Sequence, residues 1–142
     1  MTDEQTAVQE LGALVPGEPI AVTIGDADGI RCIEHGRFER LGRDAFRDRA
    51  LFWRSAGESH DVPRSALLAV HRVDPRQLAA TYRLGERVMV CRHGREHTGR
   101  VVKIARTQLT VRTLLWAGTS RERHRDVRVC ALDVRAPWDA RR

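Results

Sequence analysis

Short runs in which apolar and polar residues alternate make up most of this chain. The clearest run places Leu109, Val111, Thr113 and Leu115 on one face and Arg112 on the other. Alternation with a period of two is typical of a strand that has one buried face. Glycines and charged residues separate the runs, as in a series of short strands joined by turns. The pattern therefore predicts an all-β fold.

Residues 2–14 show the spacing of a helix instead. Ala7, Leu11 and Leu14 fall on one face of that segment, and acidic residues occupy its first turn. Acidic side chains stabilise the positive end of a helix, and apolar residues three and four apart form one stripe. We expect a short amphipathic helix at the N-terminus.

A second helical segment, 74–84, divides the chain into two similar parts. Asp74 suits the N-cap, Pro75 suits the first helical position, and Gly85 follows the expected end. We therefore expect four parts, which are an N-terminal helix (1–14), a first domain (15–73), a connecting helix (74–84) and a second domain with a C-terminal tail (85–142).

Four sequence blocks recur in the same order on the two sides of this connector. They pair 17–22 with 85–90, 29–33 with 99–104, 51–57 with 114–118, and 65–73 with 126–134. This alignment matches Trp53 with Trp116 and leaves about seven extra residues in the first copy, between its second and third blocks. Four or five short strands in about 60 residues suit a small barrel that closes its own sheet edges. The repeat predicts two such β-barrels in tandem.

Charge is divided unevenly between the two halves. Residues 1–75 carry nine arginines and thirteen acidic residues, a net charge of −4. Residues 76–142 carry fifteen arginines and one lysine against six acidic residues, a net charge of +10. Such asymmetry indicates a polyanionic partner for the second half, and guanidinium groups bind phosphate in a bidentate manner.

Residues 84–104, LGERVMVCRHGREHTGRVVKI, resemble the KOW motif of transcription-elongation factors and certain ribosomal proteins. The matching positions are Gly85, Val88, Val90, Gly94, Gly99, Val101 and Ile104. The resemblance implies an SH3-like barrel and a setting in the transcription or translation machinery. The first copy departs from the motif, because residues 17–33 carry an acidic loop where the motif usually has basic residues.

The basic residues of the second copy are the candidate site. Two predicted loops, 92–95 and 121–125, could flank one edge of the barrel and bind phosphates. With few aromatic residues available for stacking on bases, contacts to phosphates should dominate. The predicted nucleic-acid-binding residues are Arg92, His93, Arg95, Arg100, Lys103, Arg106, Arg112, Arg121, Arg123, Arg125 and Arg128.

The same loop also contains a pattern found in zinc peptidases. His93, Glu96 and His97 read H-x-x-E-H, and Cys91 lies two residues upstream. Zinc chemistry of this type requires a continuous helix, whereas Gly94 and the β-branched runs on both sides favour a hairpin. We therefore expect a polar hairpin loop, no metal, no cofactor and no enzymatic activity.

Two functions follow from these patterns. The first is a non-enzymatic accessory protein whose residues 85–142 bind DNA or RNA. The alternative is an adaptor whose basic barrel docks an acidic protein surface, since the same arginines bind phosphates and carboxylates. The barrel formed by residues 15–73 is expected either to dock a protein partner or to pack on the second barrel.

The sequence gives no sign of a membrane protein. It lacks a signal-peptide pattern and any apolar run near the roughly 20 residues needed to span a bilayer. We therefore expect no contact with membranes and a cytoplasmic location.

Overall fold

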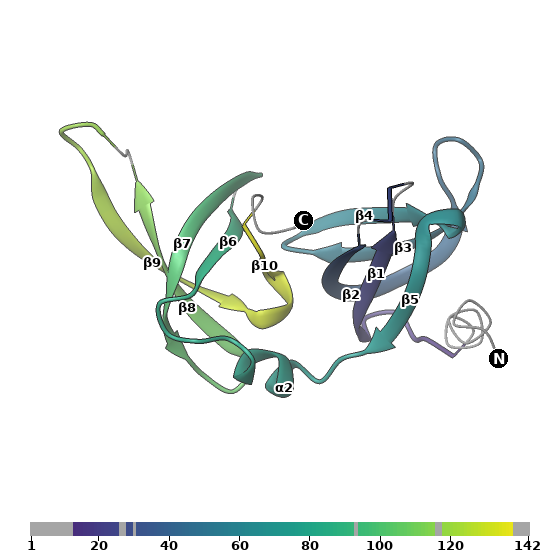
Figure 1. Cartoon of the computed structure of the whole chain (residues 1–142), viewed down its shortest axis with the longest axis horizontal. Coiled ribbons are helices and arrows are strands. Elements are labelled where there is room, and N and C mark those ends of the chain that lie inside the picture. The colour runs from purple at the N-terminus through teal and green to yellow at the C-terminus, as the bar shows by residue number, and fades with distance from the viewer. Residues whose placement is uncertain (1–12, 26–27, 30, 93, 116–117, 138–142) are drawn as a thin grey trace. The chain divides into compact units, whose positions relative to one another are not determined.

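Two antiparallel sheets of five strands each hold most of the residues described, so the all-β prediction is confirmed (Figure 1). The chain divides after Val73 into two compact units, the first unit and the second unit. No helix in the described parts of the chain is long and apolar enough to span a membrane. The computed structural model describes residues 13–25, 28–29, 31–92, 94–115 and 118–137.

The first unit is a sheet in which the last strand returns beside the first. Its strand order is β4-β3-β2-β1-β5, and a short 3-10 helix, η1 (Arg64–Ala66), joins β4 to β5. The strands are β1 (Pro19–Gly25), β2 (Arg31–Arg43), β3 (Arg49–Ser55), β4 (Glu58–Pro63) and β5 (Leu67–Arg72).

The second unit repeats this topology after one helix. Its strand order, β10-β6-β7-β8-β9, again places the last strand beside the first, and the 3-10 helix η2 (Ala131–Asp133) precedes that last strand. The remaining elements are α2 (Pro75–Ala80), β6 (Arg87–Arg92), β7 (Arg95–Ile104), β8 (Gln108–Leu115), β9 (Arg123–Cys130) and β10 (Val134–Arg135).

The expectation that each sheet closes into a barrel is wrong for the described strands. In these strands β4 does not pair with β5, and β9 does not pair with β10. A 3-10 helix turns the chain between the two edge strands of each sheet, and β10 pairs with β6 over only two residues. The strands before and after such a turn cannot continue as a hairpin, so the two edges stay apart.

Each sheet carries its hydrophobic cluster on one face, which we call the inner face. In the first unit the buried residues are Ile20, Val22, Phe38, Leu51, Trp53, Val62, Leu67 and Val70. In the second unit they are Ala79, Val88, Val90, Val101, Leu109, Val111, Ala131 and Val134. Alternate residues of β8 enter this cluster, as the sequence pattern predicts.

The two units repeat each other down to individual hydrogen bonds. Gly17 and Gly85 precede the first strand of each unit with positive φ (+90° and +86°), a conformation that glycine adopts without strain. Each donates its N–H over 2.7 Å to a carbonyl of the second strand. Each glycine carbonyl accepts a hydrogen bond from a guanidinium, at 3.0 Å from Arg37 and 2.9 Å from Arg100.

The residue-by-residue alignment differs from the one predicted from sequence. Strand pairing matches 99–104 with 36–41 and not with 29–33, because Phe38 pairs with Trp53 as Val101 pairs with Val111. Trp53 therefore corresponds to Val111, while Trp116 lies outside the described residues. The fourth block shifts as well, and 61–67 corresponds to 128–134.

Connections of unequal length explain this shift. The β1–β2 and β2–β3 connections of the first unit are longer than their equivalents in the second unit. The β8–β9 connection of the second unit is longer than the β3–β4 connection of the first. The insertions that distinguish the two units therefore lie at several places and not at one. In Figure 1, the hairpin of β8 and β9 extends beyond the other strands of its sheet. Alternation within a strand does not depend on the lengths of the connections, so the hydrophobic pattern could not reveal these differences.

The connecting helix is confirmed, but it is shorter than predicted. Asp74 caps it, and its carboxylate accepts the N–H of Arg76 at 2.9 Å. The helix ends at Ala80, where the backbone N–H and hydroxyl of Thr81 both donate to the Leu78 carbonyl. The predicted N-terminal helix lies outside the described residues except for its last two, which are not helical.

Candidate nucleic-acid interface

A β-hairpin, not a helix, carries the H-x-x-E-H residues. β6 pairs with β7 without interruption from the pair of Val90 with His97 to the pair of Arg92 with Arg95 at the end of the hairpin. Gly94 has positive φ (+74°) in the turn. Glu96 and His97 therefore point to opposite faces of one strand, unlike the ligand and base of a zinc helix. Among the described residues no group of three or more potential metal ligands gathers, and His93 lies outside them.

Four of the predicted arginines lie on the inner face at one end of the second sheet. Arg92 follows the buried Val90 by two residues and so lies on the same face of β6. Arg95 pairs with Arg92 on that face. Arg123 and Arg125 project from the neighbouring β9, where Arg125 pairs with the buried Thr113. We call Arg92, Arg95, Arg123 and Arg125 the inner arginine cluster.

The side chains of this cluster line a hollow of about 600 Å³. Its lining includes the whole inner arginine cluster and also His97, Thr113 and Val127. Thr113 is only 2% exposed, and its hydroxyl donates to the Arg125 carbonyl at 3.0 Å. This bond fixes β9 against β8 and so positions the two β9 arginines over the hollow.

Two acidic residues near the cluster in sequence, Glu96 and Asp126, lie on the opposite, outer face, and a third, Glu122, lies in the connection between β8 and β9. Glu96 pairs with Cys91 on that face and lies 3.8 Å from Arg135. Asp126 accepts two hydrogen bonds from Arg112, at 2.9 and 3.2 Å. These hydrogen bonds lower the pKa of Asp126 and raise that of Arg112. No carboxylate lines the hollow among the residues described.

Arg100 and Arg112 were predicted to bind nucleic acid, but both lie on the outer face and have partners within the unit. Arg100 donates to the carbonyl of Gly85, and Arg112 binds Asp126. Each bond links neighbouring elements of the sheet. Both guanidinium groups therefore have partners within the unit, and the structure does not bring them to the inner arginine cluster.

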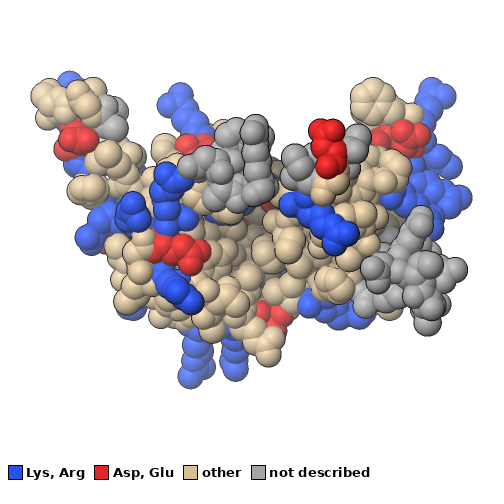
Figure 2. All heavy atoms as spheres, viewed as in Figure 1, with Lys and Arg blue, Asp and Glu red and all other residues tan. Residues whose placement is uncertain are grey.

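The remaining predicted residues are dispersed. Lys103 and Arg128 flank Thr110 on the outer face, Arg106 lies in the turn after β7, and Arg121 lies between β8 and β9. On the face shown in Figure 2, other residues separate the basic side chains of the second unit, so they do not form a continuous stripe. The predicted set is several groups rather than one surface.

His97 and Thr113 complete the hollow, and sequence reasoning missed both. Their positions follow from alternation, because His97 is two residues from Arg95 and from Gly99 on the same strand. Thr113 was recognised only as a member of a buried stripe. The alternation of side chains along each strand could have identified both residues, but only if the register between neighbouring strands had been known.

The corresponding end of the first unit has the opposite charge. Strand pairing aligns Arg92 with Ile24, Arg95 with Cys32, His97 with Glu34, Thr113 with Ser55 and Arg125 with Glu58. The small hydroxyl residue is kept in both units, while an imidazole and a guanidinium are replaced by carboxylates. The same fold thus presents cations in one unit and anions in the other.

The outer face of the second unit also has an apolar hollow, of about 590 Å³. Leu84, Val102 and Leu114 line it and are 68%, 36% and 38% exposed. Arg87 and Arg100 stand beside them. Exposed apolar residues bordered by polar ones are a common feature of protein-binding surfaces.

Comparisons of the chain with protein-family models, with curated proteins and with solved structures give no match.

Proposed function

We propose that the protein is a non-enzymatic nucleic-acid-binding accessory protein whose second unit holds phosphates with the inner arginine cluster. The observation that carries this proposal is the convergence of Arg92, Arg95, Arg123 and Arg125 on one hollow that no described carboxylate lines. The opposite charge at the equivalent positions of the first unit supports a specialised role for this end of the second unit.

Binding through these groups depends chiefly on phosphate contacts. Guanidinium groups release the counterions that condense on a nucleic acid, so affinity falls as salt rises. The described aromatic residues are too few around the hollow to stack a series of bases, which favours contacts to phosphate and sugar. We propose DNA or RNA as the ligand, with little dependence on sequence.

The KOW resemblance suggests transcription or translation as the setting. We propose that both units are SH3-like small barrels of the open kind, which would place residues 84–104 in the β–loop–β part of the motif. The shared strand order, the 3-10 helix before each last strand and the positive φ of Gly94 support this assignment.

A matched pair of triple variants tests the site. Replacing Arg92, Arg95 and Arg125 by glutamine removes three charges from the hollow and retains part of each apolar stem. Fluorescence anisotropy with labelled duplex DNA, single-stranded DNA and structured RNA would measure affinity at about 50 and about 200 mM salt. We expect weaker binding and a salt slope smaller in magnitude by about 0.9 per lost contact on duplex DNA.

The control removes the same charge elsewhere on the second unit. Lys103, Arg106 and Arg128 replaced by glutamine should leave most of the affinity and salt slope unchanged. Equal losses in both triple variants would mean that net charge alone drives binding, and would overturn the proposed site. Absence of salt-dependent binding to every nucleic acid would overturn the proposed function.

The outer apolar hollow favours a second candidate function, that of a protein-interaction adaptor. Exposed Leu84, Val102 and Leu114 beside arginines suit an acidic partner with apolar side chains. Leu84→Ser and Val102→Ser, at residues that do not line the inner hollow, should leave nucleic-acid affinity unchanged and abolish recovery of a partner by affinity purification. Recovery unchanged by these substitutions would argue against this surface.

A further inference from the structure

A separate apolar pocket of about 360 Å³ lies at the end of the first unit formed by the β2–β3 connection and η1. Its floor includes Leu51 and Leu67, which are buried, and Leu41, which is 50% exposed. A pocket of this volume is near the lower limit of ligand sites in proteins, so it suits one large apolar group rather than an extended cofactor. Exposed apolar surface bordered by polar residues is a common feature of binding sites.

Three arginines border this apolar floor. Arg43 and Arg49 pair directly across β2 and β3. The pair of Leu41 with Leu51 lies two residues further along both strands, so both pairs are on the inner face. Arg64 reaches the pocket from η1. Like charges directly opposite each other in a sheet repel, and no carboxylate lines this pocket among the described residues. An anionic group bound at the rim would relieve that repulsion.

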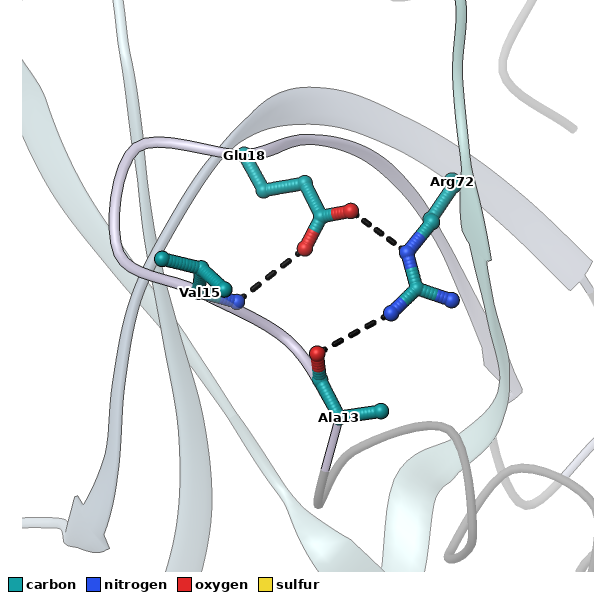
Figure 3. Close-up of polar contacts among 4 residues, drawn as sticks. All are labelled: Ala13, Val15, Glu18 and Arg72. Atoms are coloured by element: carbon teal, nitrogen blue, oxygen red, sulfur yellow. Dashed lines mark hydrogen bonds and ion pairs between the residues drawn. The ribbon is translucent and has the colours of Figure 1, made fainter.

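The arginines of this rim differ from Arg72, which has partners within the same unit. Arg72 donates to the Ala13 carbonyl at 3.0 Å and to the Glu18 carboxylate (Figure 3). The side chains of Arg49 and Arg64 make no hydrogen bond or ion pair with any residue that the structure describes. Figure 2 shows a group of basic side chains beside the β2–β3 connection. These guanidinium groups are therefore available for contacts outside the unit.

The β2–β3 connection, which joins Arg43 to Arg49, carries an exposed aromatic side chain on an ordered loop. Phe46 is 85% exposed. The Asp44 carboxylate accepts the N–H groups of Phe46 and Asp48, both at 2.9 Å, and the Asp44 N–H donates to the Asp48 carbonyl. A loop that is ordered before binding loses less conformational entropy when a partner binds. Phe46 extends the apolar surface beyond the pocket, which favours a protein partner over a small ligand.

We propose that this pocket binds an acidic segment of a partner protein, with one apolar side chain in the pocket and the neighbouring carboxylates on the arginines of the rim. Charge complementarity selects this partner, because an apolar floor bordered by three guanidinium groups matches an apolar residue between acidic ones. A long polyanion fits less well, because residues 1–75 carry a net charge of −4 and repel it as a whole. The proposal concerns the first unit, and it does not depend on nucleic-acid binding by the second.

Synthetic peptides test the proposal on the intact chain. Fluorescent nonapeptides would carry glutamates on both sides of a central leucine, phenylalanine or tryptophan, and anisotropy would give the affinity. We expect saturable binding that weakens about tenfold or more when the central residue is alanine, because burying one large apolar side chain contributes that much to affinity. Lysines in place of the glutamates should abolish binding, because they meet the arginines of the rim with like charge.

Two matched pairs of variants locate the site on the protein. Leu41→Ser should weaken peptide binding about threefold or more. Its control, Ile33→Ser, changes a 60% exposed residue on the outer face of the same strand and should alter affinity by less than about twofold. Arg64→Gln should also weaken binding, whereas Arg31→Gln removes an equal charge from an exposed residue outside the pocket and should have little effect. Both arginine variants should keep the melting temperature of the wild type, which separates binding from stability.

Amide NMR spectra of the intact chain would map the bound peptide. We expect shifts concentrated in residues 41–51 and 64–67, and the same shifts when Arg92, Arg95 and Arg125 are replaced by glutamine, so the two proposed sites fail or succeed separately. Absence of saturable binding, equal affinity for alanine-centred and apolar-centred peptides, or equal losses within either pair of variants would overturn the proposal. Single-stranded DNA that displaces the peptide and shifts the same amides would also overturn it, and would assign the pocket to nucleic acid.

Discussion

At the scale of single residues, the face of the strand decides what each arginine does. Arg112 and Arg125 lie in paired strands and carry the same charge, yet one binds Asp126 on the outer face and the other lines the inner hollow. The Asp126 carboxylate offsets the charge of Arg112, whereas no described carboxylate lines the hollow beside Arg125. The number of arginines in the sequence is therefore larger than the number of cationic side chains that the hollow offers to a phosphate.

His35 shows how a half-buried residue makes stability depend on pH. It lies on the outer face of the first sheet opposite Ala21, whose other neighbour is His71. Burial lowers the pKa of His35 below its ordinary value of 6.5, and the nearby Glu34 carboxylate opposes this effect in part. The unfolded chain consequently takes up the proton more readily than the folded one.

We predict that the first unit loses stability as pH falls from about 6.5 toward the lowered pKa of His35, because the unfolded state binds more protons in that window. Urea unfolding followed by Trp53 fluorescence, in a Trp116→Phe/Trp138→Phe background, would measure this between about pH 7 and about pH 5. His35→Gln should flatten the dependence.

The matched control for this experiment is His124→Gln, which changes an exposed histidine of the second unit. It should leave the pH dependence of the first unit unchanged. Glu18, whose pKa is lowered first by the Val15 hydrogen bond and then by that of Arg72, affects stability only as pH falls below about 4.5. An equal slope in the wild type and His35→Gln would contradict our assignment.

At the scale of elements, one glycine in the second strand of each unit permits close approach of the third strand. A Cβ on Gly99 would lie 2.5 Å from the Arg112 carbonyl oxygen and 2.7 Å from a Val111 methyl. Gly36 occupies the equivalent place, and its Cβ would meet the Arg54 carbonyl and the Trp53 ring. Backbone cannot move aside as a side chain can, so glycine is required here.

We predict that Gly36→Ala lowers the free energy of unfolding of the first unit by about 2 kcal/mol or more, because the methyl overpacks against backbone. Gly25→Ala is the control, since its Cβ would meet only the end of the Leu68 side chain. It should cost less than about 1 kcal/mol. Chemical denaturation of both variants gives the comparison, and equal costs would show that the approach of the strands is not limiting.

At the scale of the whole molecule, the chain is one fold used twice with different surfaces. The glycine before each first strand, its hydrogen bonds and the 3-10 helix before each last strand are shared. The inner end carries carboxylates in the first unit and guanidinium groups in the second. The same scaffold thus carries two inner ends of opposite charge.

We predict that residues 74–142 alone bind nucleic acid at least as tightly as the intact chain, and with the same salt slope. The inner arginine cluster lies wholly in this fragment, and removing the acidic first half lowers repulsion of phosphates. Fluorescence anisotropy at two salt concentrations measures both quantities. A fragment that stays folded by circular dichroism but binds much more weakly would show that the first unit supplies contacts.

Much of the fold follows from local rules that the sequence displays directly. Alternation along residues 109–115 places one face in the core, and Asp74 with Pro75 starts a helix, because these effects need only neighbouring residues. Glycine and β-branched residues around residue 94 exclude a helix there in the same way. The all-β class, the repeat and the hairpin in place of a zinc helix were therefore predictable.

Register and sheet closure depend on contacts between distant residues, and only the tertiary structure decided them. Alternation within a strand does not fix which residues of another strand lie opposite, so the sequence could not show that Trp53 corresponds to Val111 or that the sheets stay open. For the same reason it could not separate Arg92, Arg95, Arg123 and Arg125 from arginines on the outer face. Charge is a property of the sequence, but its direction in space depends on which strands pair.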